Sequence, residues 1–244
     1  MYSSNDVFLV TGASSGIGQA VALRLSEEGG TVIAIGRSMT SLEITKELSR
    51  HPSTFFCEKK DLVEEIEDLP SYILSLTKKY GKIRGVANCA GVTEILPLRA
   101  LDLCEMKKIF DINYYAPIFL AKAFVNKRVN IGTGSSFVSV ASIACEYQVK
   151  GVISYSGTKA ALVASMRSIA KEYAEKGIRF NCVSPSAIDT PMTRDIPEIM
   201  DKVRNSYPLG FGKPKDVASM VCFLLSKETE WITGQNYIID CASR

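Results

Sequence analysis

Short apolar runs rich in Val, Ile and Phe alternate along the chain with longer stretches in which apolar residues recur every three or four positions. The first pattern is typical of buried strands and the second of amphipathic helices. The predicted strands span residues 7–10, 32–35, 54–57, 84–88, 137–140, 179–183 and 237–239. The predicted helices span residues 17–28, 42–50, 64–80, 103–126, 153–176 and 215–226.

The order of these elements predicts a parallel sheet. Because helices separate the predicted strands, consecutive strands cannot pair through short hairpins. The strands are apolar throughout, which is typical of a sheet covered by helices on both faces. No repeat, low-complexity tract or linker interrupts the pattern. We therefore expect one α/β domain over residues 1–244, with a doubly wound parallel sheet of about seven strands and helices on both faces.

Composition and charge narrow the classes of function. Hydrophobic residues make up 46% of the chain, charged residues make up 23%, and the formal net charge is +3. Because nucleic-acid and membrane-surface binding require clustered basic charge, we expect no nucleic-acid partner and no membrane partner. No apolar run reaches the roughly 18 residues that span a bilayer. A strand-like run already begins at Val7, so we expect a cytoplasmic protein without a cleaved signal.

Histidine and cysteine usage argues against metal chemistry. The only histidine, His51, stands in a turn-like stretch before Pro52, which leaves no material for a multi-histidine metal site or a histidine-based triad. The seven cysteines are scattered and form no C-x-x-C pair, so we expect reduced thiols, no disulfide framework and no metal site. Acid–base chemistry must therefore use other side chains.

A glycine-rich turn joins the first predicted strand to the first predicted helix. Its sequence is Thr11-Gly12-Ala13-Ser14-Ser15-Gly16-Ile17-Gly18. A helix N-terminus placed directly after a strand offers free backbone N–H groups and a positive dipole end to a pyrophosphate. The alternative is a loop that needs three glycines for its own geometry. The position at the first strand–helix junction favours a Rossmann-type dinucleotide site.

Tyr155 and Lys159 form a second candidate pair. They are four residues apart and therefore share one face of a predicted helix. A nearby ammonium would lower the pKa of the phenol and let Tyr155 exchange a proton with a carbonyl or alcohol oxygen. Ser142, at the end of the preceding strand, could hydrogen-bond the same oxygen. The alternatives are a surface pair on an ordinary helix and a serine that only caps a turn.

The end of the second predicted strand reads Gly36-Arg37-Ser38. A carboxylate here would bond a ribose 2′-hydroxyl, whereas a basic residue accommodates a 2′-phosphate. Arg37 can make a charge-assisted pair with a phosphate, and Ser38 can add a hydrogen bond. NADPH is therefore predicted in preference to NADH, with a solvated turn arginine as the alternative.

Taken together, the motifs resemble those of the short-chain dehydrogenase/reductase family. The glycine spacing is T-G-x-x-x-G-x-G, where the usual dinucleotide fingerprint is G-x-G-x-x-G. Further matching segments follow in the same order along nearly the whole chain. They are Asn88-Cys89-Ala90-Gly91, Asn113, Ser142, Tyr155-x-x-x-Lys159, Ser184-Pro185-Ser186 with Asp189-Thr190-Pro191, and Ile232-Thr233-Gly234-Gln235.

The resemblance implies a role for each matched residue. Tyr155 would be the acid–base group, Ser142 would orient the substrate oxygen, and Lys159 would grip the nicotinamide ribose. Asn113 would hold a water that relays protons from Lys159. The implied cofactor-binding set comprises Gly12, Ser14, Ser15, Gly16, Ile17, Gly18, Arg37, Ser38, Asp61, Leu62, Asn88, Ala90, Gly91, Tyr155, Lys159, Pro185, Ile188 and Thr190.

Three positions depart from the family pattern. Cys89 replaces the second asparagine of N-N-A-G, Ser186 replaces the glycine of the P-G pair, and Cys241 stands in place of the first glycine of a terminal D-G-G. None of them removes a catalytic group. A side chain at position 186 could narrow the substrate pocket or alter the turn.

The sequence therefore predicts an NADPH-dependent carbonyl reductase or alcohol dehydrogenase. The resemblance is greatest to 3-oxoacyl-carrier-protein reductases, which implies a small carbonyl or alcohol substrate, with a thioester on acyl carrier protein as one option. The alternatives are an NAD-dependent sugar or polyol dehydrogenase and a non-catalytic NADP-sensing protein. Pocket walls are expected from residues 93–98, 143–152 and 192–211.

The helix that carries Tyr155 also predicts self-association. Between residues 152 and 170 only Lys159 and Arg167 are charged, and apolar residues occupy more than one helix face. We expect Met166 to point outward and a symmetric copy to cover the second face. The resemblance implies a dimer of dimers, that is, a homotetramer. The alternative is a core helix.

Overall fold

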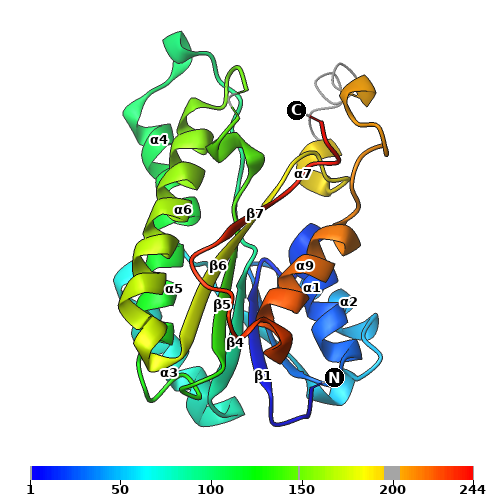
Figure 1. The fold of residues 1–244 in the computed structure, drawn as a ribbon, viewed down its shortest axis with the longest axis vertical. Helices are drawn as coiled ribbons and strands as arrows, with labels where there is room; N and C mark the ends of the chain where they lie inside the picture. Colours follow the sequence, from blue (N-terminus) through cyan, green and yellow to red (C-terminus); the bar gives the residue numbers. More distant parts are fainter. Residues whose placement is uncertain (1, 148, 195–203, 244) are drawn as a thin grey trace.

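The sheet is continuous, entirely parallel and ordered β3-β2-β1-β4-β5-β6-β7 in the computed structural model, which describes residues 2–147, 149–194 and 204–243 (Figure 1). This confirms the predicted doubly wound α/β fold. The strands are β1 Val7–Thr11, β2 Thr31–Gly36, β3 Phe55–Lys59, β4 Ile83–Asn88, β5 Ser135–Val140, β6 Ile178–Pro185 and β7 Asn236–Ile239.

Helices cover both faces of the sheet (Figure 1). One face carries α1 (Gly16–Glu27), α2 (Met39–Glu47) and α9 (Pro214–Leu225). The other carries α3 (Leu69–Tyr80), α4 (Leu103–Phe110), α5 (Ala116–Phe124) and α6 (Ile153–Tyr173), and a short α7 (Pro191–Arg194) follows β6. The right-handed crossovers that parallel strands require explain why the helices divide between the two faces.

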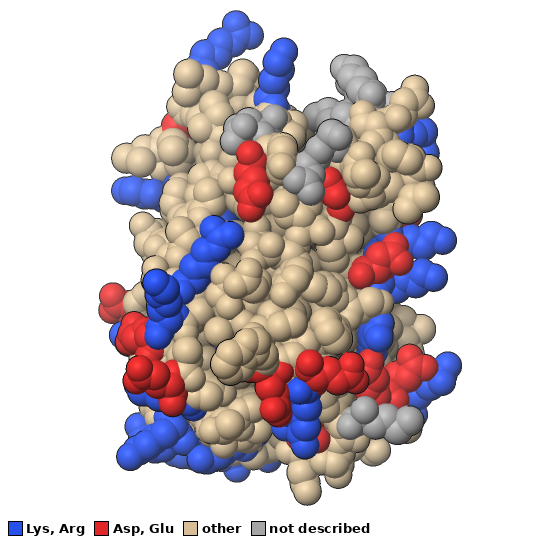
Figure 2. All heavy atoms as spheres, in the orientation of Figure 1, with Lys and Arg blue, Asp and Glu red and all other residues tan. Residues whose placement is uncertain are grey.

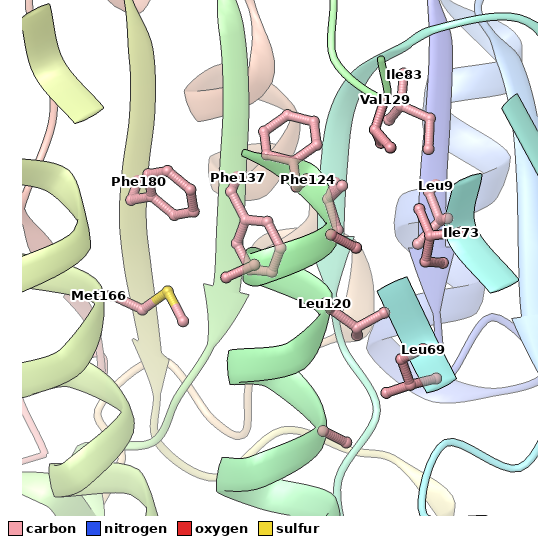
Figure 3. Close-up of a cluster of buried hydrophobic side chains, with 14 of the residues drawn as sticks. Leu9, Leu69, Ile73, Ile83, Leu120, Phe124, Val129, Phe137, Met166 and Phe180 are labelled. Atoms are coloured by element: carbon pink, nitrogen blue, oxygen red, sulfur yellow. The ribbon is translucent and has the colours of Figure 1, made fainter. Parts of the chain in front are cut away.

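The core consists of two hydrophobic clusters, one on each face. Along β1 the side chains alternate: Phe8 and Val10 belong to the cluster under α1 and α9, and Leu9 belongs to the cluster under α3, α5 and α6. In the second cluster the rings of Phe137 and Phe180 stack with centroids 5.3 Å apart (Figure 3). Because both faces are covered, every residue of β1 is buried, as the apolar run predicts.

Two predicted helices differ from those observed. The helix predicted over residues 64–80 begins at Leu69, because Pro70 in the first turn favours a start there and Glu65 has a left-handed φ of 54°. The helix predicted over residues 103–126 is divided by a π-helical turn, Asp111–Tyr115. Pro117 has no N–H for the carbonyl four residues earlier, at Asn113, so the α-helical ladder must change there.

The prediction that Met166 points outward is wrong. Its side chain is 1% exposed and extends from α6 towards the phenylalanines of β5 and β6 (Figure 3). Leu162 and Val163 are buried in the same cluster. The large apolar side chains of α6 therefore pack into the core. Its exposed positions carry small residues such as Ala160 and Ala164.

Candidate active site

The loop between β1 and α1 has the geometry of a phosphate cradle. Gly12 and Gly16 have φ values of +66° and +53°, which side chains rarely tolerate. A Cβ on Gly12 would lie 2.9 Å from the backbone nitrogen of Ala90, and one on Gly18 would collide with the carbonyl of Gly12. The Ser15 side chain makes no capping hydrogen bond, so N–H groups in the first turn of α1 remain free for an anion. These features fit a dinucleotide pyrophosphate.

A cavity of about 480 Å³ runs along this loop, at the carboxyl ends of β1, β2 and β4. Because β1 lies between β2 and β4, this edge is the switch point at which open α/β sheets bind ligands. Twelve residues predicted to bind the cofactor line it: Gly12, Ser14, Ser15, Gly16, Ile17, Gly18, Arg37, Asp61, Leu62, Ala90, Gly91 and Thr190.

Lys60 also lines this cavity, and the sequence interpretation missed it. Its backbone N–H donates to the carbonyl of Gly36 at 3.0 Å, which places it beside Arg37 across the ends of β2 and β3. The signal available in the sequence was its position directly before Asp61 at the end of a predicted strand. Val63, Lys108 and Ile112 are further lining residues that no motif marked, and Met192, from the predicted substrate-pocket wall, lines this cavity as well.

Two residues of the predicted cofactor-binding set, Asn88 and Ser38, make structural contacts. They line neither this cavity nor the one that adjoins it. Asn88 is buried at the end of β4, where its Oδ1 accepts a hydrogen bond from the Thr11 hydroxyl at 3.1 Å. The Thr11 Oγ1 in turn accepts the N–H groups of Cys89 and Ala90, each at 3.1 Å. Ser38 caps α2 by accepting the N–H of Ser41. Their contribution to cofactor binding stays a prediction.

A second cavity of about 260 Å³ adjoins the first and contains Ser142, Tyr155 and Lys159. Two further predicted cofactor residues, Pro185 and Ile188, line it. The expected pocket walls contribute as well: Thr93, Ile95, Ile143, Ala144, Val149, Val152, Met192, Thr193 and Tyr207. Residues 195–203 of the third expected wall lie outside the described residues.

Lys159 is buried, and its Nζ donates to the carbonyl of Val140 at 3.0 Å. Nζ lies 5.7 Å from the centroid of the Tyr155 ring. Burial lowers the pKa of Lys159 to about 8, because the ammonium loses hydration that one carbonyl does not replace. The lysine is therefore poised to change charge in mildly alkaline solution.

The expected lowering of the Tyr155 pKa by Lys159 is not what the structure gives. Burial of the phenol raises its pKa, and a hydrogen bond with Ser142 acts in the opposite direction. Desolvation of the phenolate is the larger effect. At neutral pH Tyr155 is thus a neutral phenol next to a serine hydroxyl, a form that can donate a proton.

Asn113 lies in the π-helical turn and is fully buried. Its Oδ1 accepts the N–H of Val92 at 3.0 Å and its Nδ2 donates to the Val92 carbonyl at 2.9 Å. A Cβ on Gly91 would lie 3.0 Å from Asn113 Oδ1 and 3.4 Å from Lys159 Nζ. The loop after β4 is therefore held against both side chains, and the water relay implied for Asn113 stays a prediction.

The described part of the chain holds neither a cluster of metal ligands nor a membrane-spanning helix. Across residues 2–147, 149–194 and 204–243, no group of three or more His, Cys, Asp and Glu side chains could hold a metal ion. Within the same part of the chain, no helix has the length and apolarity needed to cross a bilayer. All seven cysteines are unpaired.

A doubly wound sheet with a phosphate cradle at its switch point and a tyrosine–lysine–serine cluster beside it defines a nicotinamide-dinucleotide oxidoreductase. The family model described as "Enoyl-(Acyl carrier protein) reductase" matches residues 12–241. The chain belongs to the short-chain dehydrogenase/reductase family, whose members use NAD or NADP.

Known relatives extend over nearly the whole chain. It is 33% identical to the 3-oxoacyl-[acyl-carrier-protein] reductase FabG of Thermotoga maritima, with 96% of each chain covered. It is 28% identical to the cyclohexanol dehydrogenase of an Acinetobacter species, with 98% of this chain and 95% of that protein covered. A short-chain type dehydrogenase/reductase from Mycobacterium ulcerans has a similar structure, with a TM-score of 0.90 at 28% identity, covering 100% of this chain and 91% of that one.

Proposed function

We propose that the protein is an NADPH-dependent carbonyl reductase in which Tyr155 is the acid. The observation that carries the proposal is the position of Tyr155, Ser142 and Lys159 in one cavity that adjoins the cofactor cleft. A bound nicotinamide supplies the hydride that reduces a carbonyl carbon. The chain's own residues supply binding, orientation and the proton.

Each residue has a distinct task in this mechanism. The neutral Tyr155 phenol donates its proton to the carbonyl oxygen, and the Ser142 hydroxyl donates a hydrogen bond that orients that oxygen. Lys159, when charged, first stabilises the Tyr155 phenolate that remains. A proton that passes from its Nζ then restores the Tyr155 phenol. Asn113 supports this path by holding the loop at Gly91 and Val92 in place.

The preference for NADPH rests on the basic end of the larger cavity. Arg37 and Lys60 both line it, and Arg37 makes no ion pair with any described residue. Two cations that form no ion pair with the described residues, Arg37 at the end of β2 and Lys60 at the end of β3, suit a 2′-phosphate better than a 2′-hydroxyl.

The walls of the smaller cavity favour a ketone over a sugar or polyol. About half of its lining residues are aliphatic, among them Val92, Ile95, Ile143 and Val152, and the hydroxyl-bearing side chains are fewer. A polyol would leave those of its hydroxyl groups that face the aliphatic walls without partners. A 3-oxoacyl thioester remains one option within the ketone class, supported by the similarity to FabG.

The decisive experiment assays purified protein with NADPH and with NADH on a panel of ketones, acyl thioesters and keto sugars. We expect ketone reduction with NADPH. Tyr155→Phe should abolish turnover and leave NADPH binding largely intact, because only the proton-donating oxygen is lost. A Tyr155→Phe protein with near wild-type rates would contradict the mechanism. Wild-type protein that binds NADPH but reduces no member of the panel would favour the non-catalytic NADP-sensing alternative.

We also propose a homo-oligomer, a dimer of dimers, that uses the outward face of α6. Ala160, Ala164 and Ser168 are exposed on this face and are small enough for a second helix to approach closely. The middle of the neighbouring surface is mostly uncharged, with charged side chains around its edges (Figure 2). The fully exposed Trp231 supports further burial in an assembly.

A further inference from the structure

Two of the three departures from the family pattern contact the same segment, residues 204–212. The hydroxyl oxygens of Ser186 and Tyr207 lie 2.8 Å apart and share a hydrogen bond. The N–H of Leu209 donates to the Cys241 sulfur at 3.0 Å. Cys241 itself has a left-handed φ of 57°, so the chain turns at the point where it meets this segment.

Burial alone does not hold this segment in place. Leu209 is 88% exposed, and residues 204–206 and 208–210 are all exposed. Tyr207 and Phe211 contact each other edge to face, with ring centroids 5.1 Å apart. Among the described residues, the backbone of this segment joins the exit of β6 at Gly212, whose N–H donates to the Ala187 carbonyl at 3.1 Å and whose carbonyl accepts the Asp189 N–H at 2.8 Å. The Ser186 and Cys241 contacts therefore help to position Tyr207.

Tyr207 lines the substrate cavity together with its partner Ser186. Among the described lining residues, Lys159 is the single charged side chain, and it is engaged by the Val140 carbonyl. The remaining walls are aliphatic groups and hydroxyls. A substrate carbonyl placed at Tyr155 and Ser142 would therefore have its carbon skeleton among apolar groups, with the Tyr207 ring as an aromatic wall.

We propose that the Ser186–Tyr207 hydroxyl pair fixes Tyr207 as a specificity-determining wall of the substrate cavity, and that this wall selects uncharged ketones whose carbon skeleton packs against the ring. The proposal rests on the carbonyl reductase function above. Ser186 is a positioning residue that acts through Tyr207, and Cys241 supports it by holding Leu209.

The kinetic test uses NADPH with cyclic ketones, straight-chain 2-ketones and 2-oxo acids of equal carbon number. The wild type should favour the uncharged ketones by at least about ten-fold in kcat/KM, because a carboxylate would lose its hydration in this cavity. Ser186→Ala and Tyr207→Phe should each raise KM for the uncharged ketones about five-fold, the loss expected from one hydrogen bond, with kcat nearly unchanged. The double variant should be no worse than either single variant, because both remove the same contact.

Two matched variants serve as controls. Ser186→Thr keeps a hydroxyl and should raise KM less than Ser186→Ala does. Tyr80→Phe also removes a hydrogen-bonded tyrosine hydroxyl, which donates to Glu58 Oε1 at 2.6 Å, but Tyr80 lines neither cavity and the variant should leave KM unchanged. Tyr207→Ala, which removes the wall, should move the preferred ketone towards larger skeletons.

A second readout needs no turnover. Chymotrypsin can cut after Leu209 and Phe211, and cleavage there should be about five-fold faster in Ser186→Ala and in Cys241→Ala than in the wild type, because each variant loses one anchor.

The outcomes separate the two proposals. Ketone reduction by the wild type with unchanged KM values and cleavage rates in the variants would overturn the role of Ser186 and Tyr207 and leave the reductase function intact. Equal activity on 2-oxo acids would overturn the selection of uncharged substrates. Absence of any ketone reduction would overturn the reductase function and, with it, this proposal.

Discussion

Burial shifts the pKa values of Tyr155 and Lys159 in opposite directions, and both shifts favour the neutral form. A neutral tyrosine is ready to donate a proton, and a lysine with a pKa of about 8 is charged only below that pH. The pair is therefore suited to reduction at neutral or slightly acidic pH.

The Lys159 pKa predicts an alkaline limit to activity. Above about pH 8 the neutral amine no longer stabilises the phenolate, so kcat/KM for NADPH, which reports on the free enzyme, should fall with a midpoint near that value. Lys159→Arg keeps its charge and should move the midpoint upward. A flat profile up to about pH 10 would contradict the assignment.

The same pKa has a consequence for stability that is independent of catalysis. Lys159 has a folded-state pKa of about 8 against an ordinary value of 10.5, so between these values the unfolded state binds more protons. Its contribution to the free energy of unfolding should therefore rise with pH across this window, by roughly 3 kcal/mol in total. In denaturant titrations the wild type should gain stability relative to Lys159→Met between pH 8 and 10.5.

Arg37→Asp should move cofactor preference towards NADH. It removes a cation that would pair with the 2′-phosphate and places a carboxylate where a 2′-hydroxyl can bond. We expect the ratio of kcat/KM values for NADPH and NADH to fall about ten- to a hundred-fold, the range for losing a charged hydrogen bond. Arg128→Asp makes the same charge change at an exposed position outside both cavities and should leave the ratio unchanged. Wild-type protein that works equally well with NADH would refute the argument from Arg37.

At the scale of elements, the loop after β4 and the π-helical turn fit together with no spare room. Gly91→Ala would place a methyl group 3.0 Å from Asn113 Oδ1 and 3.4 Å from Lys159 Nζ. One of these side chains must move, at a cost of about 1–3 kcal/mol. We expect kcat to fall at least about ten-fold.

Gly157→Ala provides the matched comparison for Gly91→Ala. Its new methyl group would meet only Phe110 Cζ at 3.9 Å, which is an ordinary contact. Alanine should stabilise α6 by up to about 1 kcal/mol. If both variants retain wild-type kcat, the close packing around Gly91 does not contribute to the rate of catalysis.

Sequence patterns predicted elements well where a single local signal governs them. The strands appear as apolar runs because both faces of the sheet are covered, and the glycine loop appears because no other residue fits Gly12 or Gly18. The π-helical turn was missed because an inserted residue hardly disturbs the apolar period of residues 103–126. Lys60 and the raised Tyr155 pKa were missed because both depend on segments that meet only in the folded chain.

At the scale of the whole molecule, we expect the protein to self-associate through α6. Light scattering at micromolar concentration should give a mass several times the 26.7 kDa of one chain. Ala164→Arg, on the outward face of α6, should reduce that mass and lower activity with it. Ser75→Arg adds the same charge at an exposed position on α3 and should change neither quantity. A wild-type mass near 26.7 kDa would refute the oligomer.

The Thr11 hydroxyl uses its full hydrogen-bonding capacity on β4 and the loop after it. It donates its proton to Asn88 Oδ1 and accepts the N–H groups of Cys89 and Ala90. Thr11 ends β1, the strand at which the two halves of the sheet meet. Arg37 follows β2 in one half, and Tyr155 lies on α6, which packs on β6 in the other half. Thr11→Val, almost identical in shape, would leave two N–H groups and one amide oxygen without a partner. We expect this change to disturb the alignment of β1 with β4. Arg37 and Tyr155 would then be displaced relative to each other, although the Thr11 side chain contacts neither of them.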